Sequence, residues 1–140
     1  MELAGQLRNL RSGAPEVMKA FASIAQSALA TKALDRKTKE LIALAMSVAV
    51  RCDDCIGFHV KAALEQGASQ EEVTEALGMA IYMGAGPSVM YANHALEAYR
   101  QFARLATFRR KIDVFLECGQ WLRGKANPAG GGRRDVVMCA

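Results

Sequence analysis

Apolar residues recur at helical spacing along most of the chain, and this pattern constrains the fold more than any other feature of the sequence. The clearest stripe follows Asp35, a residue type that caps helix N-termini, and consists of Leu41, Leu44, Ala45 and Val48. Aromatic residues make up only 6% of the sequence, whereas alanine, leucine, methionine and valine are plentiful, which favours helices over sheets. The sequence therefore predicts an all-α fold, a compact bundle of about six helices.

Prolines, glycines and one capping box mark where these helices begin and end. Pro15 suits the first turn of a helix, and Gly67 suits the position after one. Ser69 and Glu72, three residues apart, form a capping box. Two glycines and a proline interrupt the helical pattern over 83–87. The predicted helices cover residues 15–31, 35–52, 52–67, 70–83, 88–106 and 108–118.

Charge and glycine content distinguish the C-terminal end from the rest. Residues 1–98 carry nine basic and eleven acidic side chains, whereas residues 99–140 carry nine basic and three acidic ones. The glycine-rich polar stretch after the last predicted helix cannot bury enough surface to become ordered. We predict a helical domain over 1–123 and a flexible basic tail over 124–140. The tail has no recognisable binding motif, so nucleic acid is not an expected partner.

The remaining sequence signals concern the cellular compartment. The longest apolar run, from Leu41 to Val50, is well short of the roughly 20 residues that span a bilayer. The first ten residues lack the basic and apolar regions of a signal peptide. We therefore expect a cytoplasmic protein that does not bind membranes. Cysteines in such a protein favour redox or metal chemistry over a disulfide framework, although Cys118 and Cys139 stand alone and are expected to be small hydrophobic residues.

The segment from Glu40 to His59 contains the candidate functional residues. On a helix, Cys52, Cys55 and His59 would lie along one stripe. In the first turn, unpaired amides and the helix dipole would favour thiolate over thiol. His59 could accept or relay a proton, and Glu40 could reach the site if the two helices pack antiparallel.

Each of these residues also has a simpler interpretation. The C-x-x-C pair is half of a zinc site, but no second C-x-x-C or H-x-x-x-H supplies the other ligands, so no metal is expected. His59 alone would suit a hydrogen-bonded core histidine. Glu40 could simply pair with a cation such as Arg51 or Lys61. The joint spacing of the four residues favours a functional site.

The pattern E-x11-C-x2-C-x3-H, followed by a helix that ends in glycine and by a second capped helix, resembles the alkylhydroperoxidase D-like branch of the carboxymuconolactone decarboxylase family. The match covers about 35–99. The resemblance implies an alkylhydroperoxidase D-like bundle that assembles as a homo-oligomer, a trimer or a hexamer. It further implies that Cys55 attacks a peroxide, that Cys52 donates a proton and closes a redox disulfide, and that the proton relay consists of Glu40 and His59.

The implied function is a thiol-dependent peroxidase, an antioxidant disulfide oxidoreductase with peroxiredoxin-type activity and no cofactor. Its expected partners are an organic hydroperoxide and a lipoyl or thioredoxin-like dithiol reductant, or a peroxiredoxin. One departure is Asp54, which stands where the best-known peroxidases of this branch have a histidine; an anion there disfavours a neighbouring thiolate. The alternatives are a carboxymuconolactone decarboxylase-like lyase with Glu40 and His59 as acid and base, and a non-catalytic redox-sensing oligomer.

Overall fold

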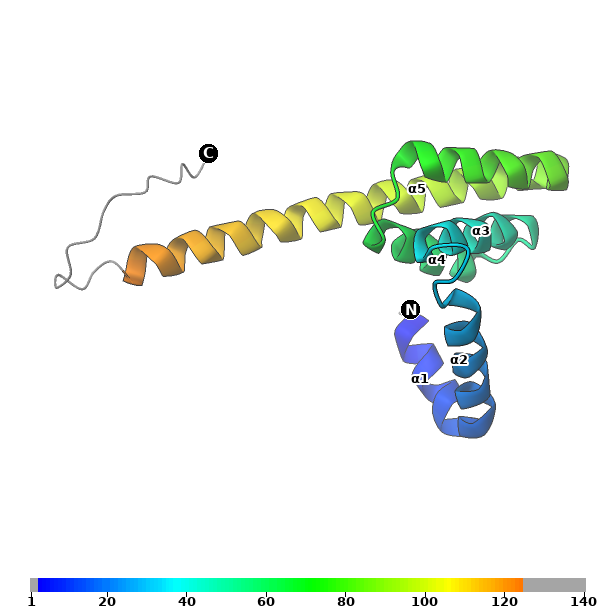
Figure 1. The fold of residues 1–140 in the computed structure, drawn as a ribbon, viewed down its shortest axis with the longest axis horizontal. Coiled ribbons are helices and arrows are strands. Elements are labelled where there is room, and N and C mark those ends of the chain that lie inside the picture. The colour runs from blue at the N-terminus through cyan, green and yellow to red at the C-terminus, as the bar shows by residue number, and fades with distance from the viewer. Residues whose placement is uncertain (1–2, 125–140) are drawn as a thin grey trace. The chain divides into compact units, whose positions relative to one another are not determined.

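The structure, a computed structural model, describes residues 3–124, with side chains for 8–114 and 116. Every secondary-structure element in this range is a helix (Figure 1), which confirms the predicted all-α fold. One structural unit ends at Phe102, and a second begins at Ala103. The predicted boundary between 123 and 124 lies at the edge of the described range and stays a prediction. The helices are α1 (Leu3–Gly13), α2 (Pro15–Leu29), α3 (Arg36–Ala49), α4 (Asp53–Glu65) and α5 (Gln70–Gly124).

Two differences from the sequence prediction concern the number of helices, five of which are labelled in the described range. Helix α1 was not predicted, and its first turn contains no acidic residue that would mark a helix start. The segment labelled α5 consists of two helical arms that meet in a kink at Ala85, whose φ and ψ are not helical, and the helices predicted over 88–106 and 108–118 form a single second arm. The predicted interruption over 83–87 is therefore confirmed, because the two arms are separated by the non-helical Ala85.

The predicted caps are confirmed at the start of α3 and α5. The Asp35 carboxylate accepts a hydrogen bond from the Thr38 amide at 2.7 Å, and this bond lowers the pKa of Asp35. In the capping box, the Ser69 amide donates to Glu72 at 2.8 Å and the Glu72 amide donates back to the Ser69 hydroxyl at 3.2 Å. Glu72 also pairs with Lys37 of α3, and this contact, with the Ser69 bond, lowers the pKa of Glu72. The same residues thus begin α5 and tie it to α3.

One apolar core joins α3 and α4 to α5. Leu44 and Val48 from α3 are fully buried with Val60 from α4. Both arms of α5 contribute as well, and fully burying side chains of this size contributes about 1.5–3 kcal/mol each. The core holds α3 and α4 in contact along their length, so that residues near the start of α3 face the second half of α4. Its remaining buried members are Ile56, Ala63, Ala68, Val73, Leu77, Ala80, Ala92 and Ala95.

The apolar stripe of α2 is not part of this core. No residue of α2 is buried, and Val17, Phe21 and Ile24 are exposed. The end of α2 is instead held by a polar contact, because the Lys39 ammonium donates to the carbonyls of Ala28 and Ala30 at 2.8 and 2.7 Å. A cation is favourable at this end of a helix, where the last carbonyls lack helical partners. None of the described helices has an apolar stretch long enough to cross a membrane.

The α5 kink depends on close packing between Gly84 and Ser88. Ala85 has φ 51° and ψ −146°, a conformation that is strained for any residue other than glycine. Ser88, one turn later, is buried. A Cβ added to Gly84 would overlap the Ser88 hydroxyl and lie 3.1 Å from the Ser88 Cβ. The bend is therefore possible because residue 84 has no side chain.

Replacing Gly84 with alanine should lower the free energy of unfolding by about 1–3 kcal/mol, the usual cost of overpacking. The matched control is Gly78→Ala in the same helix, where an added Cβ meets no atom within 4 Å. That change should raise the free energy of unfolding by about 0.5–1 kcal/mol, because alanine loses less backbone entropy on folding. Urea unfolding of both variants measures the difference, and equal shifts would show that residue 84 is not packed in this way.

Candidate functional site

A tight turn between α3 and α4 positions the two cysteines. Arg51 has a positive φ of 62°, its amide donates to the Val48 carbonyl at 3.2 Å, and the Cys52 amide donates to Ser47 at 3.0 Å. This is the hydrogen-bond pattern of a Schellman motif, with arginine where glycine is usual. Cys52 leaves the turn directly as the N-cap of α4. The turn and the start of the next helix therefore share one residue, and that residue is a cysteine.

The cysteine pair occupies the first turn of α4, as the sequence predicts. The Cys52 sulfur accepts a hydrogen bond from the Cys55 amide at 3.3 Å, so it takes the role of an N-cap side chain. A disulfide joins Cys52 and Cys55, whose Cα atoms lie 5.2 Å apart. Both residues are half-buried rather than sealed in the core. The expectation that the two sulfurs lie within bonding reach is confirmed, and their interconversion with the dithiol stays a prediction.

Glu40 is a buried carboxylate with a hydrogen-bond partner on each oxygen. Its side chain is 1% exposed; Oε1 accepts from Arg36 Nε at 2.7 Å, and Oε2 lies 2.8 Å from His59 Nδ1. The cation is thus Arg36, one turn earlier on α3, and not Arg51 or Lys61. Lys61 instead lies 3.8 Å from Glu65. The sequence contained the signal for Arg36, because residues four apart share a helix face.

The Arg36 contact determines how His59 presents its second nitrogen. An arginine can only donate hydrogen bonds, so Glu40 is an acceptor at Oε1. An ionised Glu40 also accepts at Oε2, which requires His59 to donate through Nδ1–H. In the neutral imidazole, the free lone pair is then on Nε2. His59 follows Cys55 by four residues, about one helical turn, so the two residues share one stripe of α4.

The structure places the four predicted residues in two bonded pairs. Glu40 joins His59 through a hydrogen bond and Cys52 joins Cys55 through a disulfide; α4 contains Cys55 and His59 and has Cys52 as its N-cap. The ring of the exposed Phe58 lies edge-on to His59, with centroids 6.1 Å apart, and supplies an apolar surface beside the imidazole. Such a site can exchange protons and two electrons.

Three further points concern metal ligands, the other two cysteines and a surface depression. Among the side chains that the structure describes, no group of three or more His, Cys, Asp or Glu could hold a metal ion. The predictions for Cys118 and Cys139 lie outside the described side chains. A shallow depression at the start of α5 contains none of the four predicted residues; it is lined by Gln70, Glu71, Thr74 and Glu75.

Comparisons with known proteins agree on one family. The sequence model of the carboxymuconolactone decarboxylase family matches residues 15–98. A family protein from Legionella pneumophila, whose crystal structure is solved, is 52% identical and superposes with a TM-score of 0.70, over 71% of this chain and 89% of that one. A Thermotoga maritima family protein, described in connection with an antioxidative response, is 30% identical with a TM-score of 0.68, over 74% and 89%. An uncharacterized Cupriavidus necator protein is 40% identical over 95 residues, which are 68% of this chain and 84% of its own.

Glu40→Gln should reverse the tautomer of His59. The glutamine oxygen can still accept from Arg36, but its amide group then points a donor at His59 Nδ1. His59 must accept at Nδ1 and carry its proton on Nε2. Nitrogen-15 NMR of the imidazole, at a pH where it is neutral, distinguishes the two tautomers. A wild-type spectrum with the proton on Nε2 would contradict the assigned hydrogen bonds, and Lys61→Gln serves as a control that leaves them intact.

Proposed function

The chain belongs to the carboxymuconolactone decarboxylase family, and we propose that within it this protein is a thiol-dependent peroxidase that reduces organic hydroperoxides. The observation that carries the proposal is the Cys52–Cys55 disulfide in the first turn of α4, one turn before an imidazole that is hydrogen-bonded to a buried carboxylate. A family that includes enzymes supports an enzymatic role in general. The exposed, apolar Phe58 beside His59 supports a substrate with an organic group.

The proposed reaction begins with the reduced pair. The Cys55 thiolate attacks the outer oxygen of the hydroperoxide, an S–O bond forms, and the O–O bond breaks. The departing alkoxide takes a proton and leaves as the alcohol, so the peroxide is reduced by two electrons and Cys55 becomes a sulfenic acid. Cys52 then attacks the Cys55 sulfur, an S–S bond forms, and hydroxide leaves as water after taking a proton. An external dithiol reduces the disulfide and becomes a disulfide itself.

The two thiols have different positions, which supports different roles. Cys55 lies inside the first turn of α4, where unpaired helix amides favour the thiolate. Cys52 is the N-cap, and only three residues separate it from Cys55, so closure of the disulfide needs little movement of the chain. Glu40 and His59 act as the proton relay: His59 Nε2 exchanges the proton, and Glu40 fixes the ring.

The reductant and the compartment are part of the proposal. We propose a cytoplasmic protein, because reducing conditions there supply the dithiols that regenerate the pair. In this proposal, a lipoyl or thioredoxin-like dithiol reduces the Cys52–Cys55 disulfide. Alternatively, the reduced cysteine pair itself reduces the disulfide of a peroxiredoxin.

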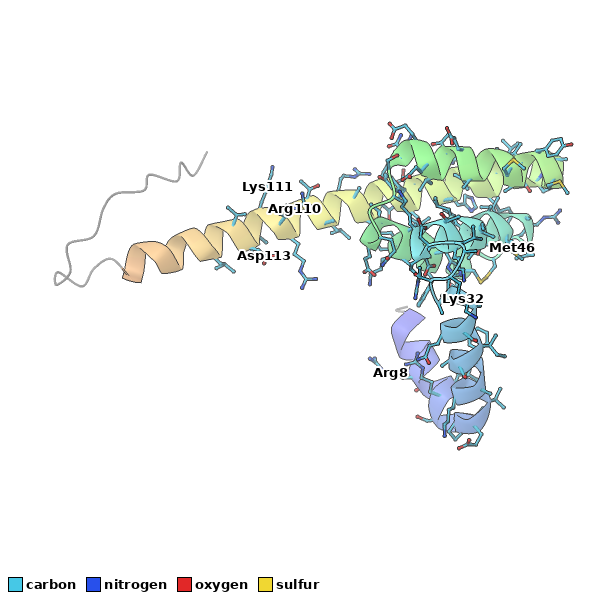
Figure 2. The ribbon with its side chains drawn as sticks, in the orientation of Figure 1. Arg8, Lys32, Met46, Arg110, Lys111 and Asp113 are labelled. Carbon is cyan, nitrogen blue, oxygen red and sulfur yellow. A yellow bond between two sulfur atoms is a disulfide. The ribbon has the colours of Figure 1, made fainter. Side chains whose placement is uncertain are left out.

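We also propose a homo-oligomer, a trimer or a hexamer. Support comes from apolar side chains that the core leaves uncovered. On α2, Phe21 and Ile24 are more than 60% exposed, and Met46 projects from the outer face of α3 with a similar exposure (Figure 2). Clusters of exposed apolar residues of this kind mark surfaces that contact other chains.

The peroxidase proposal predicts a loss of steady-state turnover when Cys55 is replaced. With cumene hydroperoxide and dihydrolipoamide, Cys55→Ser should abolish peroxide consumption. Cys52→Ser should form the sulfenic acid, trapped by dimedone, without completing the cycle. Glu40→Gln should slow turnover by about 10²-fold, within the range of general acid-base groups. Cys118→Ser, which removes a cysteine outside the pair, should retain the wild-type rate.

Three outcomes would favour another function. Peroxide consumption by Cys55→Ser would eliminate the thiol mechanism. Lactone decarboxylation that survives loss of both cysteines but not of Glu40 or His59 would favour the lyase. One equivalent of oxidation with no turnover under any dithiol would favour a redox-sensing oligomer.

The oligomer proposal predicts that a charge on the apolar face of α2 separates the subunits. Ile24→Glu should reduce the mass measured by light scattering to that of a smaller species. Gln26→Glu is the matched control, because residue 26 lies on the opposite face of the same helix. A wild-type protein that is monomeric at micromolar concentration would contradict the proposal.

A further inference from the structure

Two carboxylates share the first turn of α4 with the cysteine pair, and a histidine from α5 is paired with one of them. Asp53 and Asp54 lie between Cys52 and Cys55. We propose that His94 is a positioning residue for the reactive pair, which acts by neutralising Asp53 and thereby keeps Cys55 reactive. The proposal rests on the proposed thiol chemistry and adds a residue to it.

The geometry links His94 to the cysteine turn from a distant part of the sequence. His94 Nδ1 lies 2.8 Å from Asp53 Oδ1, although 41 residues separate the two in the chain. Ala92 and Ala95, the neighbours of His94 on α5, are packed into the core and fix the position of the helix at this level. The Tyr91 ring lies against the imidazole, with centroids 5.2 Å apart. The histidine is therefore held beside the first turn of α4 by packing as well as by the ion pair.

The charges of this turn oppose the chemistry that the cysteines require. A negative charge near a thiol disfavours its ionised form, and the turn carries two such charges adjacent to Cys55 and Cys52. Asp53 and Asp54 also compete with a thiolate for the positive end of the helix. Among the described residues, Asp54 has no ion-pair partner, whereas the charge of Asp53 is offset whenever His94 is protonated.

The solvent exposure of the His94–Asp53 pair limits its effect to the charge near the cysteines. The side chains of His94 and Asp53 are 51% and 62% exposed, so their contact adds little to the stability of the fold. The field of an exposed charge still reaches groups within a Debye length, about 8 Å at physiological ionic strength. Arg51, the exposed residue directly before Cys52, adds a positive charge next to the start of α4. A protonated His94 thus brings these groups to two negative and two positive charges.

The test measures thiol reactivity without any peroxide, so its outcome is independent of the peroxidase assay. The reduced protein is treated with iodoacetamide at pH 6, on the acid side of the range in which imidazoles titrate. The Cys55 thiolate attacks carbon, an S–C bond forms, the C–I bond breaks and iodide leaves. The disulfide is separately equilibrated with dithiothreitol, which is oxidised to its cyclic disulfide as the pair takes up two electrons and two protons.

His94→Gln keeps a hydrogen-bond donor but removes the charge. It should slow Cys55 alkylation about two- to threefold. It should also shift the equilibrium with dithiothreitol toward the Cys52–Cys55 disulfide by a similar factor. Effects of this size are expected for a unit charge that acts across solvent. His94→Lys should restore both values. Asp53→Asn combined with His94→Gln should also restore them, and Asp54→Asn should change both in the opposite direction. Lys61→Gln, which removes a cation from the other half of α4, should have no effect.

The results separate a charge effect from a structural one. Equal losses of thermal stability in His94→Gln and Asp53→Asn, with wild-type alkylation rates, would overturn the proposal. A double variant as slow as His94→Gln alone would overturn it too. If instead all variants show the expected reactivities but none of the proteins consumes peroxide, the proposed function fails while the role of His94 in thiol reactivity stands.

Discussion

The candidate site depends on the burial of one carboxylate, Glu40, between two packed helices. Moving an ionised carboxylate out of water is costly unless charged or hydrogen-bonding groups replace the lost solvent. Arg36 and His59 do so, one at each oxygen. Because removing either partner would leave a buried charge uncompensated, the three side chains constrain each other. The orientation of His59, and with it the direction of its free nitrogen, follows from this arrangement.

The backbone imposes a second constraint on the cysteines. Helix α3 ends in a Schellman motif whose left-handed residue is Arg51, and the next residue already caps α4. Any movement of the turn therefore moves Cys52, while Cys55 is carried by the first turn of the helix. The same antiparallel packing that places Glu40 beside His59 brings the end of α3 to the start of α4. The Glu40–His59 pair and the half-buried cysteines are thus connected both through α4 and through the turn that ends α3.

The parts of this arrangement that the sequence predicts are those that depend on near neighbours. Asp35 and the Ser69–Glu72 box bond to amides within three residues, so their chemistry is visible in the local pattern. Arg36 is an exception: its i,i+4 spacing from Glu40 is a local signal, but the sequence interpretation considered Arg51 and Lys61 instead. The break at Ala85 is predicted by the neighbouring glycines and proline, whereas no pattern shows that Ser88 packs against Gly84. The Asp53–His94 contact joins residues too distant for any local rule.

The two histidines of the described unit illustrate how burial assigns different roles to one residue type. His59 is 24% exposed and its partner Glu40 only 1%, so their hydrogen bond is little weakened by water and fixes both ring orientation and tautomer. Asp53 and His94 are each more than half exposed, and water and salt weaken their attraction. A contact shielded from water suits His59, because its ring must keep one nitrogen in a constant direction. A solvent-exposed contact suits His94, which only adjusts the charge beside the thiols. That adjustment needs no fixed geometry and costs the fold little stability.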